Sequence, residues 1–458
     1  MYYTPMLNEL VACMEDDGSR PNNSRPDFGI QAGYTYFGQF VDHDLTNNPS
    51  SLADAMEMEP EQIVNQSTPV LDLQHLYGGG PWDEKDCQLY EENEVRFKIG
   101  AKVDSVVDDS RGRRSFDVGL SADGYPLVAD MRASENIILR QITAVFARLH
   151  NAAVEQFRSK IRDPFQLFAC ARQQTMWQFQ HLVYEDYLPA VLNTEVYRSV
   201  FVENRPTICW DLFSTPIEFA VAGMRFGHSM VRNGYDLSNF TSKSVSEITE
   251  RGTRPEALEP EWEVDWGRFF QNADPGGPAS SAQPIDTKIS RALFNISINT
   301  LMLFNSGAGI RQMTNGLPVT SIRLPLITLL RGAAMRLPSG QRVARGFSEA
   351  PLEPEELTRD PNGNPTRDGE VLRQHEMTEE TPLWYYVLKE SEMRENGSRL
   401  GPTGSHIMAE TIHAALRYDP SSFLNDPKAE TTSLEWQFPS GKTQIKSLSS
   451  LFEHASEF

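Results

Sequence analysis

The sequence predicts a mainly α-helical fold: a single large helical domain with few short strands. Apolar residues recur at spacings of three and four in several long segments, as they do along the buried face of a helix. Runs that alternate with a period of two, the pattern of strands, are few and short. The chain has 458 residues with 24 Phe, 14 Tyr and 7 Trp, enough to bury a large core. Length alone also allows two or three domains.

Five segments are expected to be helical, and each has its own periodicity or boundary signal. The first carries Ile138, Ile142 and Leu149 on one face. The second ends before Pro189, and the last begins after the helix breaker Gly401-Pro402. The third is almost wholly apolar, as a buried helix would be. In chain order, the expected helices are residues 133–157, 164–187, 217–231, 290–304 and 404–418.

Two loop-rich stretches, residues 241–282 and 347–381, carry many acidic residues and prolines. We interpret them as surface connections, because the helical segments on either side lack self-contained cores. The chain is therefore expected to form one domain over residues 30–425. An N-terminal extension over 1–29 precedes it, and a C-terminal tail over 426–458 is expected to pack on or near the same domain.

The composition excludes several classes of protein. Acidic residues outnumber basic ones by 63 to 42, a formal charge of −21, so no nucleic-acid partner is expected. No long uninterrupted apolar run is present, so no membrane span is expected. The N-terminus lacks a secretory signal pattern, and a cytoplasmic location and unconventional export both remain open. Buried free thiols in a reducing compartment are favoured for the cysteines, which form no CxxC pair: Cys13, Cys87, Cys170 and Cys209.

The densest polar motif in an apolar context lies at residues 36–45. If this segment is helical, Gln39, Asp42 and His43 share one face, whereas Asp44 points about 100° away from His43. Two carboxylates beside a buried histidine are costly unless each binds a partner. The motif therefore indicates a site, although a helix cap with a satisfied core histidine fits the same residues.

Two further motifs contain side chains suited to a site. Arg132 and Glu135 lie three apart at the start of the first long helix, where they can face one site together or pair at the surface. Ser134 can form a capping box there. His228 is a lone histidine in an apolar helix, next to Gly227, which lets a flat ligand approach closely. Such a histidine is more often a satisfied core residue.

A fourth motif alternates oxygen-bearing groups along residues 68–74. Thr68, Asp72 and Gln74 can supply side-chain oxygens to a hard cation such as calcium, and Val70 can supply its backbone carbonyl. A plain edge strand has the same alternation, so the motif by itself fits both interpretations.

Taken together and in order, these motifs resemble the animal-type haem peroxidases, the peroxidase–cyclooxygenase superfamily. Residues 38–44 (GQFVDHD) resemble the distal motif of that family, and residues 226–228 (FGH) resemble its proximal-histidine motif. The other similar segments are the catalytic-arginine helix at residues 129–136 and 146–151 and the calcium loop at residues 68–78. The resemblance runs from about residue 30 to residue 425 and includes segments similar to bacterial members.

The resemblance implies a helical domain around a buried haem b and a peroxidase that oxidises a small organic or halide donor with hydrogen peroxide. His43 would be the distal acid/base, and Arg132 would stabilise charge on the departing oxygen. Gln39 would hold distal water or a halide. His228 would be the axial ligand of the haem iron. The remaining implied ligands are Asp42 and Glu135 for haem esters, Arg331 for a propionate, and Asp44, Thr68, Val70, Asp72 and Gln74 for calcium.

Three departures from the family pattern are visible. Gln74 stands where calcium loops of the family often have Ser or Asp, which lowers the negative charge of the ligand set. Thr328 replaces the Asn that normally accepts the second N–H of the proximal histidine, which affects the basicity of His228. Ala333-Ala334 replaces an Arg-Asp pair, while Arg331 is retained.

Two other functions are compatible with the same fold. Fatty-acid dioxygenases of the superfamily carry a tyrosine three residues before the proximal histidine, and this chain has Arg225 there. A different tyrosine could serve in its place. A non-catalytic protein stabilised by haem or calcium would need no acid/base, so the joint presence of Gln39, His43 and Arg132 with His228 favours a peroxidase.

Overall fold

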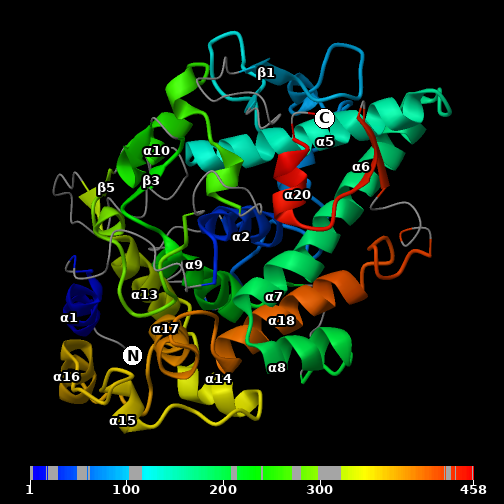
Figure 1. The fold of residues 1–458 in the computed structure, drawn as a ribbon. Coiled ribbons are helices and arrows are strands. Elements are labelled where there is room, and N and C mark those ends of the chain that lie inside the picture. Colours follow the sequence, from blue (N-terminus) through cyan, green and yellow to red (C-terminus); the bar gives the residue numbers. More distant parts are fainter. Residues whose placement is uncertain are drawn as a thin grey trace.

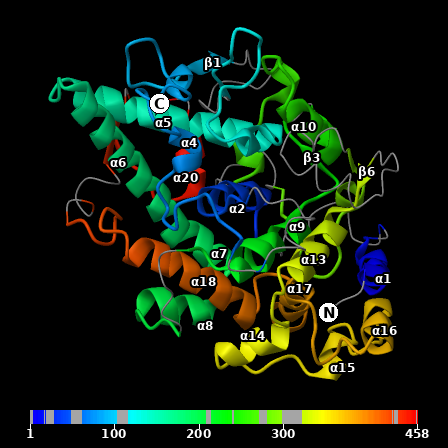
Figure 2. The same ribbon diagram turned by 180° about the vertical axis from the view of Figure 1, so that it is seen from behind.

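The protein is mainly helical, with short strands, as the sequence predicts (Figures 1 and 2). The computed structural model describes residues 4–16, 18, 29–48, 59, 62–102, 116–207, 214–238, 241–270, 280–297, 321–427, 429, 435–438, 440–455 and 457–458. The α-helices of these residues are α1 (Thr4–Met14), α2 (Ala32–Leu45), α4 (Gln74–Tyr77), α5 (Ile137–Arg158), α6 (Pro164–Leu182), α7 (Leu188–Val191), α8 (Thr194–Tyr197), α9 (Gly227–Met230), α10 (Val245–Gly252), α13 (Leu324–Ala334), α14 (Gly340–Gly346), α15 (Pro354–Leu357), α16 (Arg367–Gln374), α17 (Leu383–Glu395), α18 (Pro402–Arg417) and α20 (Leu448–Glu453).

Short 3₁₀- and π-helical turns connect many of these helices. The 3₁₀ turns are η2 (Cys87–Leu89), η4 (Met131–Ser134), η8 (Met224–Phe226), η9 (Pro260–Trp262), η10 (Trp266–Arg268) and η11 (Arg291–Phe294). The π turns are η5 (Val183–Tyr187), η6 (Arg198–Val202) and η7 (Phe219–Gly223). The described strands pair antiparallel, two by two: β1 (Ile99–Lys102) with β2 (Phe116–Val118), β3 (Gly234–Asp236) with β4 (Ser242–Ser244), β5 (Ile296–Ser297) with β6 (Ser321–Ile322), and β7 (Glu435–Phe438) with β8 (Gly441–Gln444).

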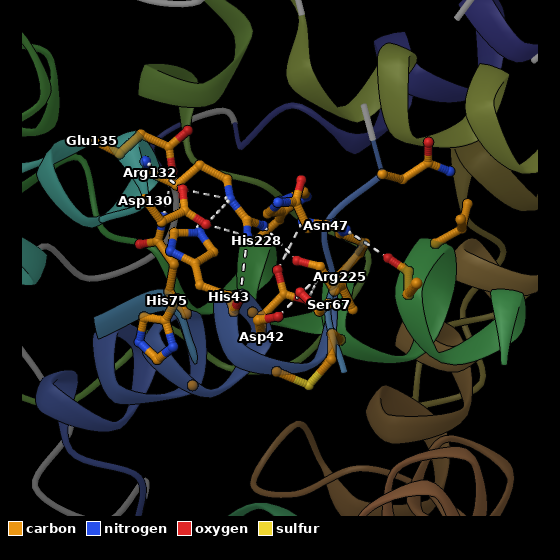
Figure 3. Close-up of a pocket in the computed structure, with 18 of the residues that line it drawn as sticks. Asp42, His43, Asn47, Ser67, His75, Asp130, Arg132, Glu135, Arg225 and His228 are labelled. Carbon is orange, nitrogen blue, oxygen red and sulfur yellow. Dashed lines mark hydrogen bonds and ion pairs between the residues drawn. The ribbon is translucent and has the colours of Figure 1, made fainter. Parts of the chain in front are cut away.

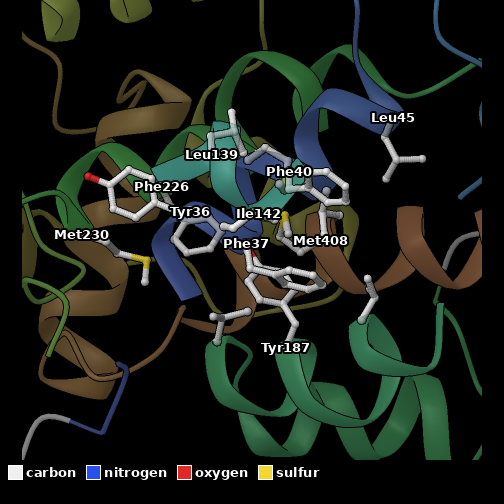
Figure 4. Packing of buried hydrophobic residues seen from close by; sticks show 14 of the residues in the cluster. Tyr36, Phe37, Phe40, Leu45, Leu139, Ile142, Tyr187, Phe226, Met230 and Met408 are labelled. Atoms are coloured by element: carbon white, nitrogen blue, oxygen red, sulfur yellow. The ribbon is translucent and has the colours of Figure 1, made fainter. Parts of the chain in front are cut away.

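Helix α2 lies at the centre of the molecule and is held there by aromatic packing (Figures 1 and 4). The ring of Phe40 stacks on Phe146 of α5 at a centroid distance of 4.8 Å, and Phe37 meets Tyr187 edge to face at 5.6 Å. These rings are buried in one core together with residues of α5 and α6. Because this face of α2 is packed, the face that carries Gln39, Asp42 and His43 is left for a cavity.

Gly38 is required by the same packing. A Cβ atom at this position would lie 2.5 Å from the hydroxyl oxygen of Tyr187, well inside contact distance. The glycine therefore lets the tyrosine ring lie directly against the α2 backbone.

The first two predicted helices are confirmed, with changed ends. Helix α5 begins after Asn136, whose side chain accepts a hydrogen bond from Leu139 N, so the capping box predicted at Ser134 is wrong. Ser134 instead donates to Met131 O within the preceding turn η4. The second helix was predicted to end before Pro189, and it continues through the π turn η5 into α7. A wider turn there accommodates a proline, which has no N–H to donate.

The later helices agree less uniformly with prediction. The segment at 217–231 is helical but changes from π to 3₁₀ to α geometry through η7, η8 and α9. Helix α18 confirms the last prediction. The helix predicted over 290–304 is wrong in its described part, which forms η11 and strand β5; residues 298–304 lie outside the described residues. There Ile296 pairs with Ile322 of β6, and a β-branched residue suits that pairing better than a helix.

Both terminal segments pack on the same body. Glu9 of α1 lies 2.8 Å from His375, and Trp436 of β7 donates to Gln178 of α6 at 2.8 Å. The domain limits at residues 30 and 425 stay a prediction. In the described part of the chain, no helix combines the length and apolar composition that a membrane crossing requires.

The cysteine prediction holds only in part. Cys13 is free and buried. Cys87 and Cys170 are free but exposed, so the expected burial is wrong for these two. Cys87 begins the turn η2, and Cys170 lies on the exposed side of α6, whose buried side carries Leu167 and Ala171. Cys209 lies outside the described residues.

Candidate active site

A single large cavity of about 1310 Å³ lies beside α2 and collects residues from distant parts of the chain (Figure 3). The predicted residues that line it are Gln39, Asp42 and His43 of α2, Arg132 and Glu135 around η4, His228 of α9, Thr328 and Arg331 of α13, and Gln74. Asp44, Thr68, Val70 and Asp72 are not among its lining residues. The cavity exceeds the 300–1,000 Å³ or so of common ligand pockets, so it has room for a macrocycle.

His43 is buried in the wall of the cavity. Its Nε2 lies 3.8 Å from Glu135 Oε2, and its Nδ1 has no hydrogen-bond partner among the described residues. Burial, together with the positive charge of Arg132, lowers the pKa of His43 well below its ordinary value. A neutral imidazole beside a cavity can accept a proton from a ligand that enters it.

Arg132 is fixed in one orientation by a set of acceptors. Its guanidinium donates to Asp130 Oδ2 at 2.6 Å, to Thr46 O at 2.7 Å and to His43 O at 3.1 Å. Burial alone would raise the pKa of Asp130, but the hydrogen bonds and charge of Arg132 lower it to about 2. Asp130 has no assigned role in the sequence interpretation; its position at the N-cap of η4, two residues before Arg132, is the signal for one.

Gln39 and Glu135 are bonded to each other. Gln39 Nε2 donates to Glu135 Oε2 at 2.7 Å, and Asn136 Nδ2 donates to Gln39 Oε1 at 3.2 Å. The Glu135 side chain retains 26 % exposure, and Glu135 lines the cavity. Burial raises the pKa of Glu135 to about 7, although Arg132 and Arg225 oppose the rise. A carboxyl that holds or loses a proton near neutrality therefore lies next to the distal histidine.

Asp42 joins the distal helix to the helix of the second histidine. Its Oδ2 lies 3.2 Å from Arg225 Nη1, and its Oδ1 accepts a hydrogen bond from Thr46 Oγ1 at 2.9 Å. Arg225 also donates from Nε to Ala220 O at 3.0 Å. The sequence interpretation missed this ion pair, because the two residues are 183 positions apart. Both Asp42 carboxylate oxygens therefore have partners within the protein.

The second histidine, His228, has a different environment. Its Nδ1 lies 3.4 Å from Thr328 Oγ1, and that hydroxyl donates its own proton to Leu324 O at 3.0 Å. The hydroxyl is thus an acceptor toward His228, at a distance typical of a weak bond. The Trp384 ring meets the imidazole edge to face at 6.0 Å between centroids. Burial, with a smaller contribution from Arg225, lowers the pKa of His228 to about 3.

Gly227 and Arg331 complete this side of the cavity. A Cβ atom added to Gly227 would meet open space, so the glycine leaves room beside His228. Burial, with a smaller contribution from Arg225, lowers the pKa of Arg331 to about 10, and its side chain remains a cation at neutral pH.

The loop at residues 68–74 lies against the far side of α2 and is tied to Asp44. Leu73 N donates to Asp44 Oδ2 at 3.0 Å, and His75 Nδ1 lies 3.0 Å from Asp44 Oδ1. Asp72 accepts from Thr68 Oγ1 at 3.2 Å. Burial and the charge of Asp44 raise the pKa of Asp72 to about 6. The role of His75 was missed by the sequence interpretation.

These oxygens suit calcium by type. The loop supplies the Asp72 carboxylate, the Thr68 hydroxyl and the Gln74 amide oxygen, and α2 supplies the Asp44 carboxylate, which repels that of Asp72. Within the described ranges, no cluster of three or more His, Cys, Asp or Glu side chains forms a metal site. Calcium binding would therefore depend on the hydroxyl, amide and carbonyl oxygens as much as on the acids.

Part of the chain is similar to a known protein family. Residues 50–272 match the family model of the animal haem peroxidase, a range that includes Arg132, Glu135 and His228 and begins after α2. A peroxidase-like protein of Margaritifera margaritifera is 24 % identical over 260 residues, which cover 44 % of this chain and 32 % of that protein. The chain thus spans about a third of the length of the curated relative it matches.

Solved structures share the fold. Peroxidase A from Dictyostelium discoideum matches with a TM-score of 0.61 and 16 % identity, covering 98 % of this chain and 88 % of that chain. The fatty acid alpha-dioxygenase of Arabidopsis thaliana matches with a TM-score of 0.59 and 13 % identity, covering 97 % and 74 %. That of Oryza sativa matches with a TM-score of 0.57 and 14 % identity, covering 93 % and 74 %. The chain therefore shares the fold of these solved structures, and just under half of it, residues 50–272, matches the animal haem peroxidase family model.

Proposed function

We propose that this protein is a haem-dependent peroxidase that reduces hydrogen peroxide and oxidises a small organic or halide donor. The observation that carries the proposal is the convergence of His43, Arg132 and Gln39 on the same cavity as His228. A neutral imidazole and a fixed guanidinium are the acid/base and the charge stabiliser that cleavage of an O–O bond needs. The distal hydrogen bonds described above support these roles.

The residues fit a haem. His228 would bind the iron, with its Nδ1 hydrogen turned toward Thr328, and Gly227 leaves room for the macrocycle. Arg331 lines the cavity as a cation suited to a propionate. The haem would supply the redox-active iron at which peroxide binds. Ester links at Asp42 and Glu135 are part of the proposal; Glu135 faces the cavity, whereas Asp42 would first have to leave Arg225.

The side chains of the distal half would then handle the proton and the charge. His43 takes the proton from the near oxygen of hydrogen peroxide and gives it to the far oxygen, which leaves as water. Arg132 stabilises the charge that develops on the departing oxygen, and Asp130 keeps the guanidinium in place. Gln39 holds a water or a halide by hydrogen bonding, with Glu135 and Asn136 fixing its amide.

Calcium is the second proposed cofactor. Asp44, Asp72, Thr68, Gln74 and the Val70 carbonyl would bind it and fasten the loop to α2 next to His43. Metal analysis of purified protein should find about one calcium per chain, and prolonged chelation or Asp72→Ala should lower the thermal midpoint of unfolding. Active protein without calcium would contradict this part of the proposal and leave the peroxidase part standing.

A fatty-acid dioxygenase is the second candidate, because two of the similar structures are fatty acid alpha-dioxygenases. Arg225, three residues before His228, is engaged with Asp42 and cannot form the radical that a tyrosine would. Three tyrosines line the cavity, Tyr34, Tyr36 and Tyr187, and Tyr187 is the one we would replace first. Oxygen consumption with a long-chain fatty acid, abolished in Tyr187→Phe, would favour this candidate.

The deciding experiment is stopped-flow mixing of the haem-loaded protein with hydrogen peroxide. The wild type should show a rapid change in the haem spectrum, and His43→Ala should slow it by about 10²-fold or more with haem still bound. His181→Ala is the matched control, because His181 is a half-buried histidine that packs on Phe423 outside the cavity. Near-wild-type rates in His43→Ala would overturn the distal assignment.

A further inference from the structure

A buried tryptophan of helix α17, Trp384, packs beside His228 of the cavity. The Trp384 ring lies edge to face against His228, 6.0 Å between centroids, and its indole Nε1 donates to Arg225 O at 2.9 Å. Trp384 is 2 % exposed. The hydrogen bond to Arg225 O, in the segment that also carries the proposed axial ligand, therefore holds the indole ring beside His228.

The next residue along α17 is a buried tyrosine bonded to a carboxylate. Tyr385 is fully buried, and its hydroxyl donates to Asp368 Oδ2 at 2.6 Å. Thr287 Oγ1 donates to the same oxygen at 3.3 Å. Asp368 belongs to the first turn of α16, where the adjacent Arg367 is exposed, so the pair lies one layer below the surface. In Figure 1, α17 lies between the site helices α9 and α13 and the outer helix α16.

The charges around this pair favour a neutral phenol beside an ionised acid. Burial and the Asp368 carboxylate raise the pKa of Tyr385 well above its ordinary value. Burial would raise the pKa of Asp368, but the Tyr385 hydrogen bond and the charge of Lys389 lower it below its ordinary value. The phenol therefore cannot lose its proton alone at neutral pH, yet a proton acceptor is already in contact with its oxygen.

We propose that Trp384 and Tyr385 form an electron-transfer path that delivers one oxidising equivalent from the haem site to the Tyr385–Asp368 pair. This inference rests on the proposed peroxidase function. Its consequence is a second oxidation site, distinct from the cavity, from which a one-electron donor too large to enter the cavity can be oxidised through the surface of α16.

The proposed path moves one electron and one proton. Reduction of one hydrogen peroxide to water would leave the haem site two electrons short. Trp384 would supply one electron to that site and would in turn be reduced by one electron from Tyr385, while a small donor in the cavity would supply the second. The Tyr385 O–H proton moves along the existing hydrogen bond to Asp368 Oδ2, which leaves a neutral phenoxyl radical and a neutral carboxylic acid. A one-electron donor then reduces the radical, and the proton returns to the phenol oxygen.

A purely structural role for Tyr385 makes a different prediction, and α17 offers a matched control. Tyr386 is equally buried on the same helix, but its hydroxyl accepts from Leu352 N at 2.8 Å, and no described hydrogen bond joins it to a carboxylate. If burial alone mattered, Tyr385→Phe and Tyr386→Phe would behave alike. If the carboxylate contact matters, only Tyr385→Phe should abolish radical formation.

The test is rapid freeze-quench electron paramagnetic resonance of the haem-loaded full chain mixed with one equivalent of hydrogen peroxide. The wild type and Tyr386→Phe should show a tyrosyl radical, which Tyr385→Phe and Trp384→Phe should lose. Asp368→Asn should reduce its yield, since the amide is a poor proton acceptor. A radical of unchanged yield and line shape in Tyr385→Phe would overturn the inference.

Two further measurements, isotope labelling of tyrosine and the haem absorption spectrum, identify the radical and separate the path from the proposed function. Wild-type protein grown with ring-deuterated tyrosine should show a narrowed radical signal, and an unchanged signal would overturn the inference even if the variants fail to fold. The haem absorption spectrum is recorded in the same experiment. No change in that spectrum on adding peroxide to the wild type would contradict the proposed function itself, whereas a haem that reacts without forming a tyrosyl radical would contradict only the path.

Discussion

The two histidines of the cavity differ in their neighbours far more than in their own chemistry. Burial lowers the pKa of both, so both imidazoles are neutral near pH 7. On the distal side, Arg132, Gln39 and Glu135 crowd His43 with charge and hydrogen-bonding groups. On the proximal side, His228 meets one threonine hydroxyl and one indole ring. In the proposed function, the surroundings of each imidazole, rather than its basicity, would separate proton transfer at His43 from iron binding at His228.

The two sides also differ in how firmly their polar groups are held. The Arg132 guanidinium donates to the Asp130 carboxylate and to two carbonyls, Thr46 O and His43 O, whereas His228 Nδ1 has a single acceptor at 3.4 Å. A short charged network holds one geometry, because each member restrains the next. A long neutral hydrogen bond restrains less. Four experiments, from the largest expected effect to the smallest, can break or sharpen this contrast.

Removing the proximal imidazole should have the largest effect. In His228→Ala the proposed axial ligand is lost, so the protein should bind less haem or bind it with a changed absorption spectrum. His43→Ala removes the other imidazole of the cavity and should leave the haem content unchanged. Haem stoichiometry and the visible spectrum of both variants check this. Equal haem loss in the two would mean that the sides are assigned wrongly.

Loosening the distal network should have the next largest effect. Asp130→Asn keeps the size of the side chain but removes the charge that holds Arg132. The peroxide-dependent spectral change should slow on the order of 10-fold, since a misplaced guanidinium stabilises charge less well. Stopped-flow absorbance measures the rate. Asp117→Asn breaks another buried arginine pair, with Arg140, away from the cavity, and it should affect stability without that specific loss of rate.

Strengthening the proximal contact should change the redox behaviour more than the rate. Thr328→Asn places an amide acceptor where the hydroxyl makes a weak bond to His228 Nδ1, so the ligand should become more basic and the reduction potential of the iron should fall. Thr328→Val removes the acceptor with little change of shape and should shift the potential upward. Spectroelectrochemical titration of both variants measures the shift. Shifts of the same sign would contradict the assigned role of Thr328.

The smallest expected effect concerns Glu135 and pH. Its pKa is raised from 4.5 to about 7, so its contribution to stability is present below the unfolded pKa and is lost as the pH rises through about 7. Glu135→Gln mimics the protonated form, so the haem-free variant should be more stable than the wild type above pH 7, on the order of 2 kcal/mol. At pH 4 the two should unfold alike in denaturant titrations. A stability gain of the same size at pH 4 and pH 8 would rule out this carboxyl as the cause.

The sequence alone determined the fold class and several of the residues that line the cavity. Helical spacing placed Gln39, Asp42 and His43 on one face of a helix that does form, and the ordered motifs indicated the residues that meet in the cavity. These features are local, because they depend on the spacing of residue types within a few turns of one segment. The error at residues 290–297 has the opposite origin, since the strand there depends on pairing with residues 321–322.

Only the tertiary structure decided which partner each site residue has. Asp42 pairs with Arg225, Glu135 accepts from Gln39, and Trp384 packs on His228. Each of these contacts joins two segments that lie 96 to 183 residues apart in the chain. The strength of a hydrogen bond or ion pair changes when the donor–acceptor distance changes by a few tenths of an ångström. Those distances are set by how the helices pack against one another, not by the spacing of residues along any one helix.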